Sequence, residues 1–249
     1  MSRPLAGRRF LVTRRPQQAG GLVALLRDAG AEVIEAPAIT IAPPEDPREI
    51  GNALARLHEY DWIVFTSANA VGAVAELGAP RGGRSPLVAS IGPATTRAIQ
   101  ESFARAPDLV PESDYRAEGL AAALVARGVS GARILLPLSD RARDTLETRL
   151  RAAGARVDRV VAYRTLPAPG AAESIAHALG QGFDLVLFAS PSAVESFAAV
   201  AGHRTLGLPA GVIGPVTREA AQDAGLVVRA VAEPSTAQGL VVALVRLFT

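Results

Sequence analysis

Small polar side chains follow apolar segments at several places in the sequence, each time just before a helix is expected. The clearest examples are residues 65–71 (FTSANAV) and 188–194 (FASPSAV), and the pattern returns at residues 91–98 (IGPATTRA), 213–220 (IGPVTREA) and 233–240 (EPSTAQGL). Serine, threonine and asparagine are preferred at helix starts, where unpaired backbone N–H groups and the positive end of the helix dipole attract anions. This pattern therefore predicts the binding of carboxylates or phosphates.

Each of these motifs, taken singly, is also what any α/β protein needs in order to begin a helix. Five such helix starts facing a shared cleft would instead favour a ligand that bears several carboxylates and is held mainly by backbone groups. The residues alone leave both interpretations open.

Tyr163 is one of only three tyrosines and closes the apolar segment at residues 157–165 (VDRVVAYRT). Its hydroxyl could reach a ligand in the cleft. A core aromatic residue that hydrogen-bonds a linker is the alternative interpretation. Tyr115, which precedes a helix expected at Glu118, is a second and weaker candidate.

Other catalytic signatures are missing from the chain. Cysteine is absent, and there is no phosphate loop, dinucleotide-binding glycine fingerprint, GxSxG nucleophile motif or HExxH metal motif. His58, His177 and His203 are scattered, and we expect each of them to be solvated rather than to bind a metal. Asp61 and Asp184 precede apolar segments at equivalent places, which favours strand-end or turn roles.

The composition is that of an ordinary globular protein, with 249 residues, 49% hydrophobic and 20% charged. The net charge is +2, and every Lys or Arg in the chain is an arginine, which gives a mild preference for anionic ligands. Arg8 and Arg9 are expected only to flank the first strand. No basic helix or aromatic platform suggests nucleic-acid binding. No apolar run suggests a membrane span or a secretory signal. We expect a cytoplasmic monomer.

The chain repeats itself. Residues 61–71 (DWIVFTSANAV) return 123 residues later as residues 184–194 (DLVLFASPSAV). Blocks in the same order at nearly constant spacing indicate a duplicated unit, because solenoid repeats are much shorter. The other matching blocks are residues 8–33 with 132–157, 88–99 with 210–221, and 116–124 with 236–244.

The elements that position these residues alternate between short apolar runs and longer amphipathic segments. This alternation predicts parallel sheets with crossover helices, whose strands are buried on both faces. Helices are expected at residues 17–29 and 145–153, ended by Gly30 and Gly154. The fold class expected is α/β, with two doubly wound, flavodoxin-like domains whose helix starts lie at the carboxyl edges of the sheets. Strands are expected at residues 9–13, 32–39, 62–66, 87–92, 133–138, 157–165, 185–190, 211–214 and 226–231.

Segments 35–41 and 160–166 have the character of crossings between domains, although the residues alone equally permit a single break near residue 130. Residues 43–47 (PPEDP) and 79–86 (APRGGRSP) are expected to be surface loops.

Together these motifs resemble uroporphyrinogen-III synthase along essentially the whole chain. The resemblance implies two flavodoxin-like domains joined by a two-stranded linker, with the active site in the cleft between them. It favours one domain from residues 1–37 and 167–249 and another from residues 38–166. The motifs that carry it are VTRRPQQAGGL, YDWIVFTSANAV, IGPATTRA, VDRVVAYRT, FASPSAVESF, IGPVTREAA and PSTAQGLVVAL.

The activity that the resemblance implies is cyclisation of hydroxymethylbilane, a linear tetrapyrrole with eight carboxylates. The product is uroporphyrinogen III with ring D inverted, water is lost, and no cofactor or metal is used. Tyr163 matches the tyrosine proposed in the family as the acid that assists departure of the hydroxyl. The positions that match ligand contacts are Thr13, Arg14, Ser67, Asn69, Thr95, Ser190, Ser192, Thr217, Ser235 and Thr236.

The second hypothesis is a non-enzymatic module. Two similar α/β lobes around a ligand cleft also describe cytoplasmic domains that sense small molecules. Such a module would bind its metabolite and convert nothing.

Overall fold

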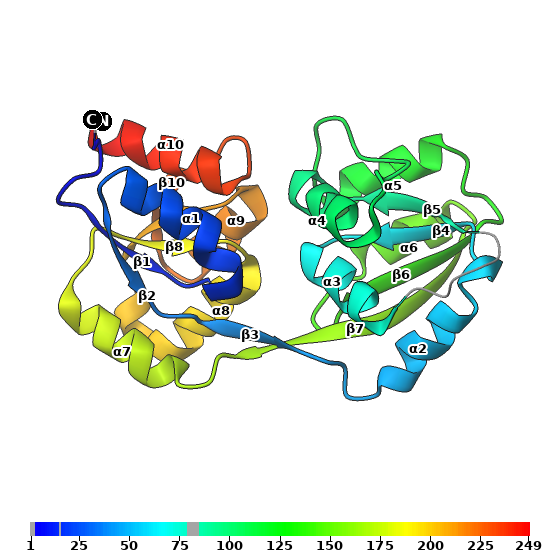
Figure 1. Cartoon of the computed structure of the whole chain (residues 1–249), viewed down its shortest axis with the longest axis horizontal. Coiled ribbons are helices and arrows are strands. Elements are labelled where there is room, and N and C mark those ends of the chain that lie inside the picture. Colours follow the sequence, from blue (N-terminus) through cyan, green and yellow to red (C-terminus); the bar gives the residue numbers. More distant parts are fainter. Residues whose placement is uncertain (1–2, 15, 79–84) are drawn as a thin grey trace. The chain divides into compact units, whose positions relative to one another are not determined.

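The computed structural model describes residues 3–14, 16–78 and 85–249. The chain divides into two compact units (Figure 1): unit 1 comprises Met1–Thr40 and Leu166–Thr249, and unit 2 comprises Ile41–Thr165. Both changes of unit fall within strands, β3 (Ile39–Ala42) and β7 (Arg156–Pro167), which are neighbours in one sheet. Among the described residues, no helix is both long enough and apolar enough to cross a membrane.

Unit 1 is built on a parallel sheet with the strand order β2-β1-β8-β9-β10. All four residues of β8 are buried, which explains why this segment is continuously apolar. In register, Phe10 lies opposite both Val33 and Leu185. The strands are β1 (Arg9–Val12), β2 (Glu32–Glu35), β8 (Leu185–Phe188), β9 (Pro209–Val212) and β10 (Val227–Val231).

Helices cover both faces of the unit 1 sheet. Leu26 of α1 and Leu244 of α10 share a core with Phe10 on one face. Ile175 of α7 shares a core with Val186 on the other face, where α8 and α9 also pack. The helices are α1 (Pro16–Asp28), α7 (Ala171–Gln181), α8 (Pro191–Ala201), α9 (Pro215–Asp223) and α10 (Ala237–Phe248), with the 3-10 turn η2 (Gly202–Thr205).

Unit 2 has the strand order β3-β7-β6-β4-β5, and its β7/β6, β6/β4 and β4/β5 pairs are parallel. Successive residues Ile63 and Val64 belong to different cores, as expected for a strand buried on both faces. The first core includes α2, α3 and α4, and the second includes α5 and α6. The bounds are β4 (Trp62–Phe65), β5 (Leu87–Ser90), β6 (Arg133–Ser139), α2 (Pro47–Ala55), η1 (Leu57–Glu59), α3 (Ala68–Leu77), α4 (Pro93–Phe103), α5 (Ala117–Ala126) and α6 (Thr145–Ala152).

The first strand of each repeat is fixed by an equivalent aspartate. The Asp184 carboxylate accepts from Arg9 N at 2.7 Å, and the Asp61 carboxylate accepts from Arg133 N at 2.9 Å. Arg9 and Arg133 are equivalent in the repeat. The predicted strand-end role of both aspartates is therefore confirmed.

The prediction of one continuous strand over residues 32–39 is wrong. The segment is divided into β2 and β3, with Pro37 between them. Ala38 N donates to Thr13 O at 3.0 Å, and Ser196 Oγ of α8 donates to Ala38 O at 2.7 Å. The loop expected at residues 43–47 ends at Pro47, where α2 begins behind the cap Asp46. Most of the loop expected at residues 79–86 lies outside the described residues.

Candidate active site

A β-bulge determines where the Tyr163 side chain points. Leu138 pairs with Val161, but the next residue of β6, Ser139, pairs with Tyr163. Ala162 is therefore the extra residue of the bulge, and Ala162 and Tyr163 both lie in the core beneath α3. Without the bulge, strand alternation would direct the phenol to the opposite face of the sheet.

The Tyr163 hydroxyl lies at the start of α3. Its oxygen is 3.0 Å from Ser67 Oγ, and the Tyr163 residue is only 7% exposed. Ser67 is the N-cap of α3 and accepts from Ala70 N at 3.1 Å. The bond from Ala70 N uses one lone pair of Ser67 Oγ, so the Ser67 hydroxyl can still either donate to the phenol or accept from it.

The surroundings of Tyr163 keep its phenol protonated. Burial raises the pKa of the Tyr163 phenol above its usual value of 10.0, and the negative charge of Asp140 acts in the same direction. Hydrogen bonds with Ser67 and Asn69 act against this rise in pKa. They favour the phenolate, so the site can both hold the proton at neutral pH and stabilise the anion formed when the proton leaves.

Three of the predicted site residues, Ser67, Asn69 and Tyr163, therefore lie together, with Ser67 after the carboxyl end of β4 and Tyr163 of β7 beside the carboxyl end of β6. The sequence-based prediction did not include Ser139 and Asp140, which complete this cluster. A signal was present, because residues 138–140 (LSD) repeat the pattern of a small polar residue directly after an apolar run.

The equivalent helix start in unit 1 also has a serine as its N-cap, but the residue that corresponds to Tyr163 is not a tyrosine. Ser190 is the N-cap of α8 and accepts from Ala193 N at 3.2 Å, and Ser192 follows in the first turn, half-buried. In the repeat, Tyr163 corresponds to Ile39. Within the described residues, unit 1 thus has the serine-capped helix start but no tyrosine at this place.

The two Gly-Pro helix starts are alike. Gly92 precedes α4 and Gly214 precedes α9, each followed by proline at the first helical position. Thr95 and Thr217 are each only 3% exposed, so at these starts the backbone N–H groups are better placed than the threonine side chains to meet a ligand. The Tyr115 ring lies against Gly92, where an added Cβ would be 3.1 Å from it.

The remaining predicted contacts belong to unit 1. The Thr13 side chain is completely buried, and its hydroxyl donates to Leu187 O at 2.8 Å. Arg14 is half-buried. Thr236 caps α10 by accepting from Gly239 N at 3.0 Å, and the exposed Ser235 lies against Gly214 at the start of α9.

All three histidines are exposed, which confirms that they are solvated. Within the described residues, no group of three or more His, Cys, Asp or Glu side chains could hold a metal ion.

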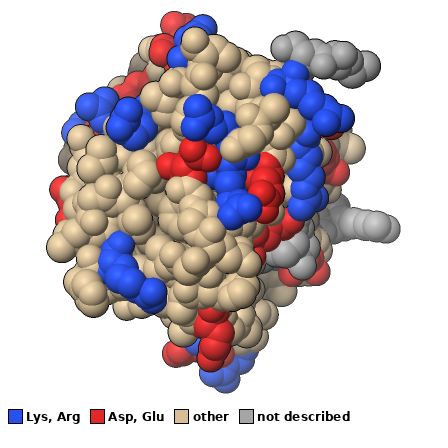
Figure 2. Space-filling model, turned by 90° about the vertical axis from the view of Figure 1, so that its left-hand side faces the viewer, with Lys and Arg blue, Asp and Glu red and all other residues tan. Residues whose placement is uncertain are grey.

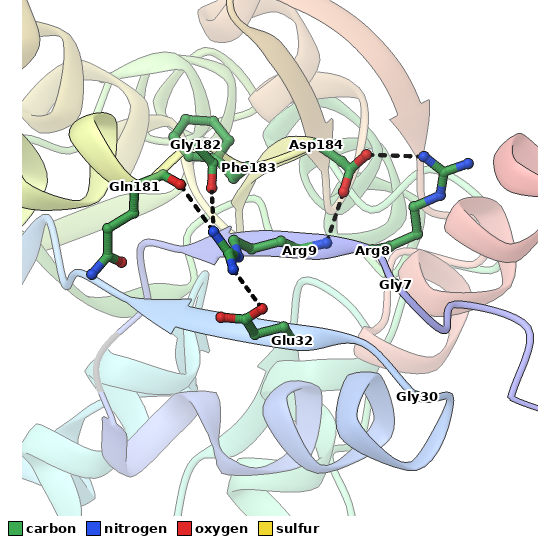
Figure 3. A pocket seen from close by; sticks show the side chains of 9 residues that line it. All are labelled: Gly7, Arg8, Arg9, Gly30, Glu32, Gln181, Gly182, Phe183 and Asp184. Atoms are coloured by element: carbon green, nitrogen blue, oxygen red, sulfur yellow. Dashed lines mark hydrogen bonds and ion pairs between the residues drawn. The ribbon is translucent and has the colours of Figure 1, made fainter.

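A pocket lies at the amino-terminal edge of the unit 1 sheet, on the side away from the carboxyl ends of the strands (Figure 3). Its lining residues have structural roles. The Arg9 guanidinium donates to Gln181 O at 2.9 Å at the end of α7 and pairs with Glu32 at 2.8 Å. Arg8 pairs with Asp184 at 3.1 Å. Figure 2 shows basic and acidic side chains next to one another on one face of the molecule, rather than a continuous basic patch. These arginines secure strand and helix ends.

The fold and the cluster around Tyr163 place the protein among the α/β proteins whose parallel sheets bind ligands at the carboxyl ends of their strands. A family model described as Uroporphyrinogen-III synthase HemD matches residues 21–242. A putative uroporphyrinogen-III synthase from Methanothermobacter thermautotrophicus is 36% identical over 230 residues, covering 86% of this chain and 89% of the relative. Uroporphyrinogen-III synthase from Synechococcus elongatus is 30% identical over 255 residues, covering 97% and 96%.

Solved structures show the same fold. A mutant uroporphyrinogen III synthase from Thermus thermophilus superposes with a TM-score of 0.68 at 20% identity, covering 97% of this chain and 98% of that one. Uroporphyrinogen-III synthetase from Helicobacter pylori gives 0.59 at 14% identity, covering 96% and 99%. The chain belongs to the uroporphyrinogen-III synthase family. Its activity is that of a cyclising lyase of tetrapyrrole biosynthesis, which confirms the enzymatic hypothesis over that of a sensing module.

Proposed function

We propose that this uroporphyrinogen-III synthase uses Tyr163 as the acid that assists departure of the terminal hydroxyl of hydroxymethylbilane. The observation that carries the proposal is the buried phenol, held 3.0 Å from Ser67 Oγ at the carboxyl edge of the unit 2 sheet. A buried tyrosine that is protonated at neutral pH can donate its proton when a hydroxyl group is brought to it.

In the first step, the phenol proton passes to the departing hydroxyl, which leaves as water. The nitrogen lone pair of the adjacent pyrrole ring forms a protonated azafulvene, a cation that keeps its N–H, and hydrogen bonds from Ser67 and Asn69 stabilise the Tyr163 phenolate. Ring D attacks through its substituted carbon to give a spiro intermediate, which breaks and recloses with ring D inverted. The proton finally lost from ring D restores the phenol, so the net change is loss of one water.

Selectivity is the larger task for the protein, because the same azafulvene can close without inversion. A hundredfold preference for the inverted isomer requires only about 2.7 kcal/mol of differential transition-state stabilisation. Holding the substrate in one conformation can supply this amount. We assign that role to the helix starts capped by Ser67, Ser190 and Thr236 and to the Gly-Pro starts of α4 and α9, which present N–H groups to the substrate carboxylates.

We further propose that the two units are flavodoxin-like domains that arose by duplication. The strands of unit 1, numbered along the chain, have the order 2-1-3-4-5 of that fold. Unit 2 has the same strand order if its β6 is taken as the counterpart of β1, β7 of β2, β4 of β8 and β5 of β9. In unit 2 the bridge between Ala89 and Leu109 stands in the place of β10, and β3 is added beside β7.

The direct test is an assay that resolves the two products. The purified chain is mixed with hydroxymethylbilane, the products are oxidised, and the type I and type III isomers are separated by chromatography. We expect type III to dominate and to increase with enzyme concentration. Formation of the type I isomer alone, at the spontaneous rate, would overturn the proposal.

A further inference from the structure

Asp140 continues the pairing of β7 beyond the end of β6. β6 ends at Ser139, whereas β7 runs on to Pro167. Asp140 N donates to Tyr163 O at 3.1 Å, and Asp140 Oδ1 accepts from Thr165 N at 3.0 Å. One backbone bond and one side-chain bond of Asp140 thus replace the missing strand. They fix the backbone of β7 at Tyr163 and two residues beyond it.

The same carboxylate oxygen orients a side chain of the phenol cluster. Asp140 Oδ1 accepts the hydroxyl proton of Ser139 at 2.9 Å. A serine hydroxyl has a single proton, so Ser139 Oγ is left as an acceptor toward its other neighbours. Those neighbours include Arg141 N at 3.3 Å and Thr165 Oγ1 at 3.4 Å. Asp140 thereby ties Ser139, the strand partner of Tyr163, to the backbone of β7.

We propose that Asp140 is a positioning residue for the reaction: one oxygen of its carboxylate holds the backbone of β7 and the Ser139 hydroxyl so that the Tyr163 phenol keeps its productive orientation. This inference rests on the proposed role of Tyr163 as the acid.

The hydrogen bonds of Asp140, rather than its charge, carry this role. Asp140 is exposed, so water and salt screen its charge. Its two accepted hydrogen bonds have fixed geometry at the end of a sheet. An asparagine at this position keeps an Oδ1 acceptor without the charge, whereas an alanine loses the acceptor.

The experiment compares Asp140→Asn, Asp140→Ala, Tyr163→Phe and the double variant Asp140→Ala/Tyr163→Phe, with kcat and KM measured for formation of the type III isomer. Asp144→Ala is the matched control, because Asp144 is exposed in the same loop and makes no side-chain capping bond to α6. We expect Asp140→Ala to lower kcat about three- to tenfold, the size of one lost hydrogen bond, with KM within about twofold. Asp140→Asn and Asp144→Ala should stay within about twofold of the wild-type kcat.

The decisive readout is the double variant. If Asp140 acts through Tyr163, then Asp140→Ala causes no further loss of kcat once the phenol is gone. An equal loss in both backgrounds would overturn the inference, as would a wild-type kcat for Asp140→Ala. If Asp140→Ala does not fold, Ser139→Ala takes its place, because it removes the hydrogen bond from Ser139 to Asp140 and leaves the bond between Asp140 and Thr165.

Failure of the underlying proposal gives a different result. In that case Tyr163→Phe alone retains the wild-type kcat, and the assignment of Asp140 falls with it. A large loss for Tyr163→Phe together with an additive effect of Asp140→Ala overturns only the assignment of Asp140.

Discussion

Ser67 and Ser190 form a matched pair that separates helix capping from catalysis. Each is the N-cap of a helix at the equivalent place in the repeat, and each accepts a backbone N–H, at 3.1 Å for Ser67 and 3.2 Å for Ser190. Among the described residues, Ser67 alone of the two has a second polar partner across the sheet edge, the Tyr163 hydroxyl at 3.0 Å. Replacing each serine with alanine removes the cap in both variants and the phenol contact in one.

The expected magnitudes follow from these contacts. Loss of an N-cap serine costs typically about 1 kcal/mol, so Ser67→Ala and Ser190→Ala should lower the unfolding free energy of their own units by similar amounts. Loss of one neutral hydrogen bond is worth about 0.5–1.5 kcal/mol, which is about two- to tenfold in rate. We therefore expect Ser67→Ala to lower kcat by that factor. Ser190→Ala should instead raise KM and leave kcat near wild type, because it weakens the ground state and the transition state equally.

The assay is the initial rate of type III formation over a range of hydroxymethylbilane concentrations, with thermal unfolding followed by circular dichroism. The stability measurement checks that the two caps are equivalent. Equal losses of kcat in the two variants would refute the reasoning. It would also be refuted if Ser67→Ala lost stability as expected but kept the wild-type kcat, because the phenol contact would then have no part in the reaction.

Three further outcomes are expected. Burial raises the pKa of Tyr60, which donates to Asp158 Oδ2 at 2.7 Å, to about 12. Because this pKa lies above the usual 10.0, the stability that Tyr60 contributes is complete below pH 10 and is lost as the pH rises toward 12. Tyr60→Phe should therefore make the unfolding free energy fall less steeply with pH between pH 10 and 12. The chain has no lysine whose titration would dominate this range. An unchanged slope of unfolding free energy against pH would contradict the assignment. Gly239→Ala should cost about 1–3 kcal/mol, since its Cβ would lie 2.1 Å from Pro234 O, whereas Gly180→Ala in α7, with no atom within 4 Å, should gain roughly 0.5–1 kcal/mol. Thermal unfolding of the two variants checks this, and equal stabilities would be the contrary result. Finally, KM should rise severalfold between about 0.1 M and 1 M salt, where the screening length falls from about 10 Å to 3 Å. A KM independent of salt would count against binding through several carboxylates.

The regular parts of the fold could be predicted from the sequence because each local signal is strong. Continuous apolar runs such as residues 185–188 exist only where both faces of a strand are covered, and the structure buries all four residues. The helix from Pro16 to Asp28 ends before Gly30, which adopts a left-handed φ of 93°. Caps such as Ser67 and Ser190 could also be predicted, because serine before a helix has few other roles.

Details of the site depend on tertiary contacts that have no local signal. The bulge at Ala162 decides which face Tyr163 occupies, and nothing in residues 157–165 distinguishes a bulged strand from a regular one. The Thr13 hydroxyl donates to Leu187 O, which is 174 positions away in the chain.

The most direct test of this account is the turnover of hydroxymethylbilane by Tyr163→Phe, with the type III isomer measured separately from the spontaneous type I isomer. Phenylalanine keeps the ring that packs in the core beneath α3, so circular dichroism should show the fold intact. General acids contribute roughly 10²–10⁴ in rate, and a bound water can replace part of this, so we expect kcat to fall about tenfold or more. An undiminished kcat would contradict the account and return Tyr163 to the role of a core aromatic residue.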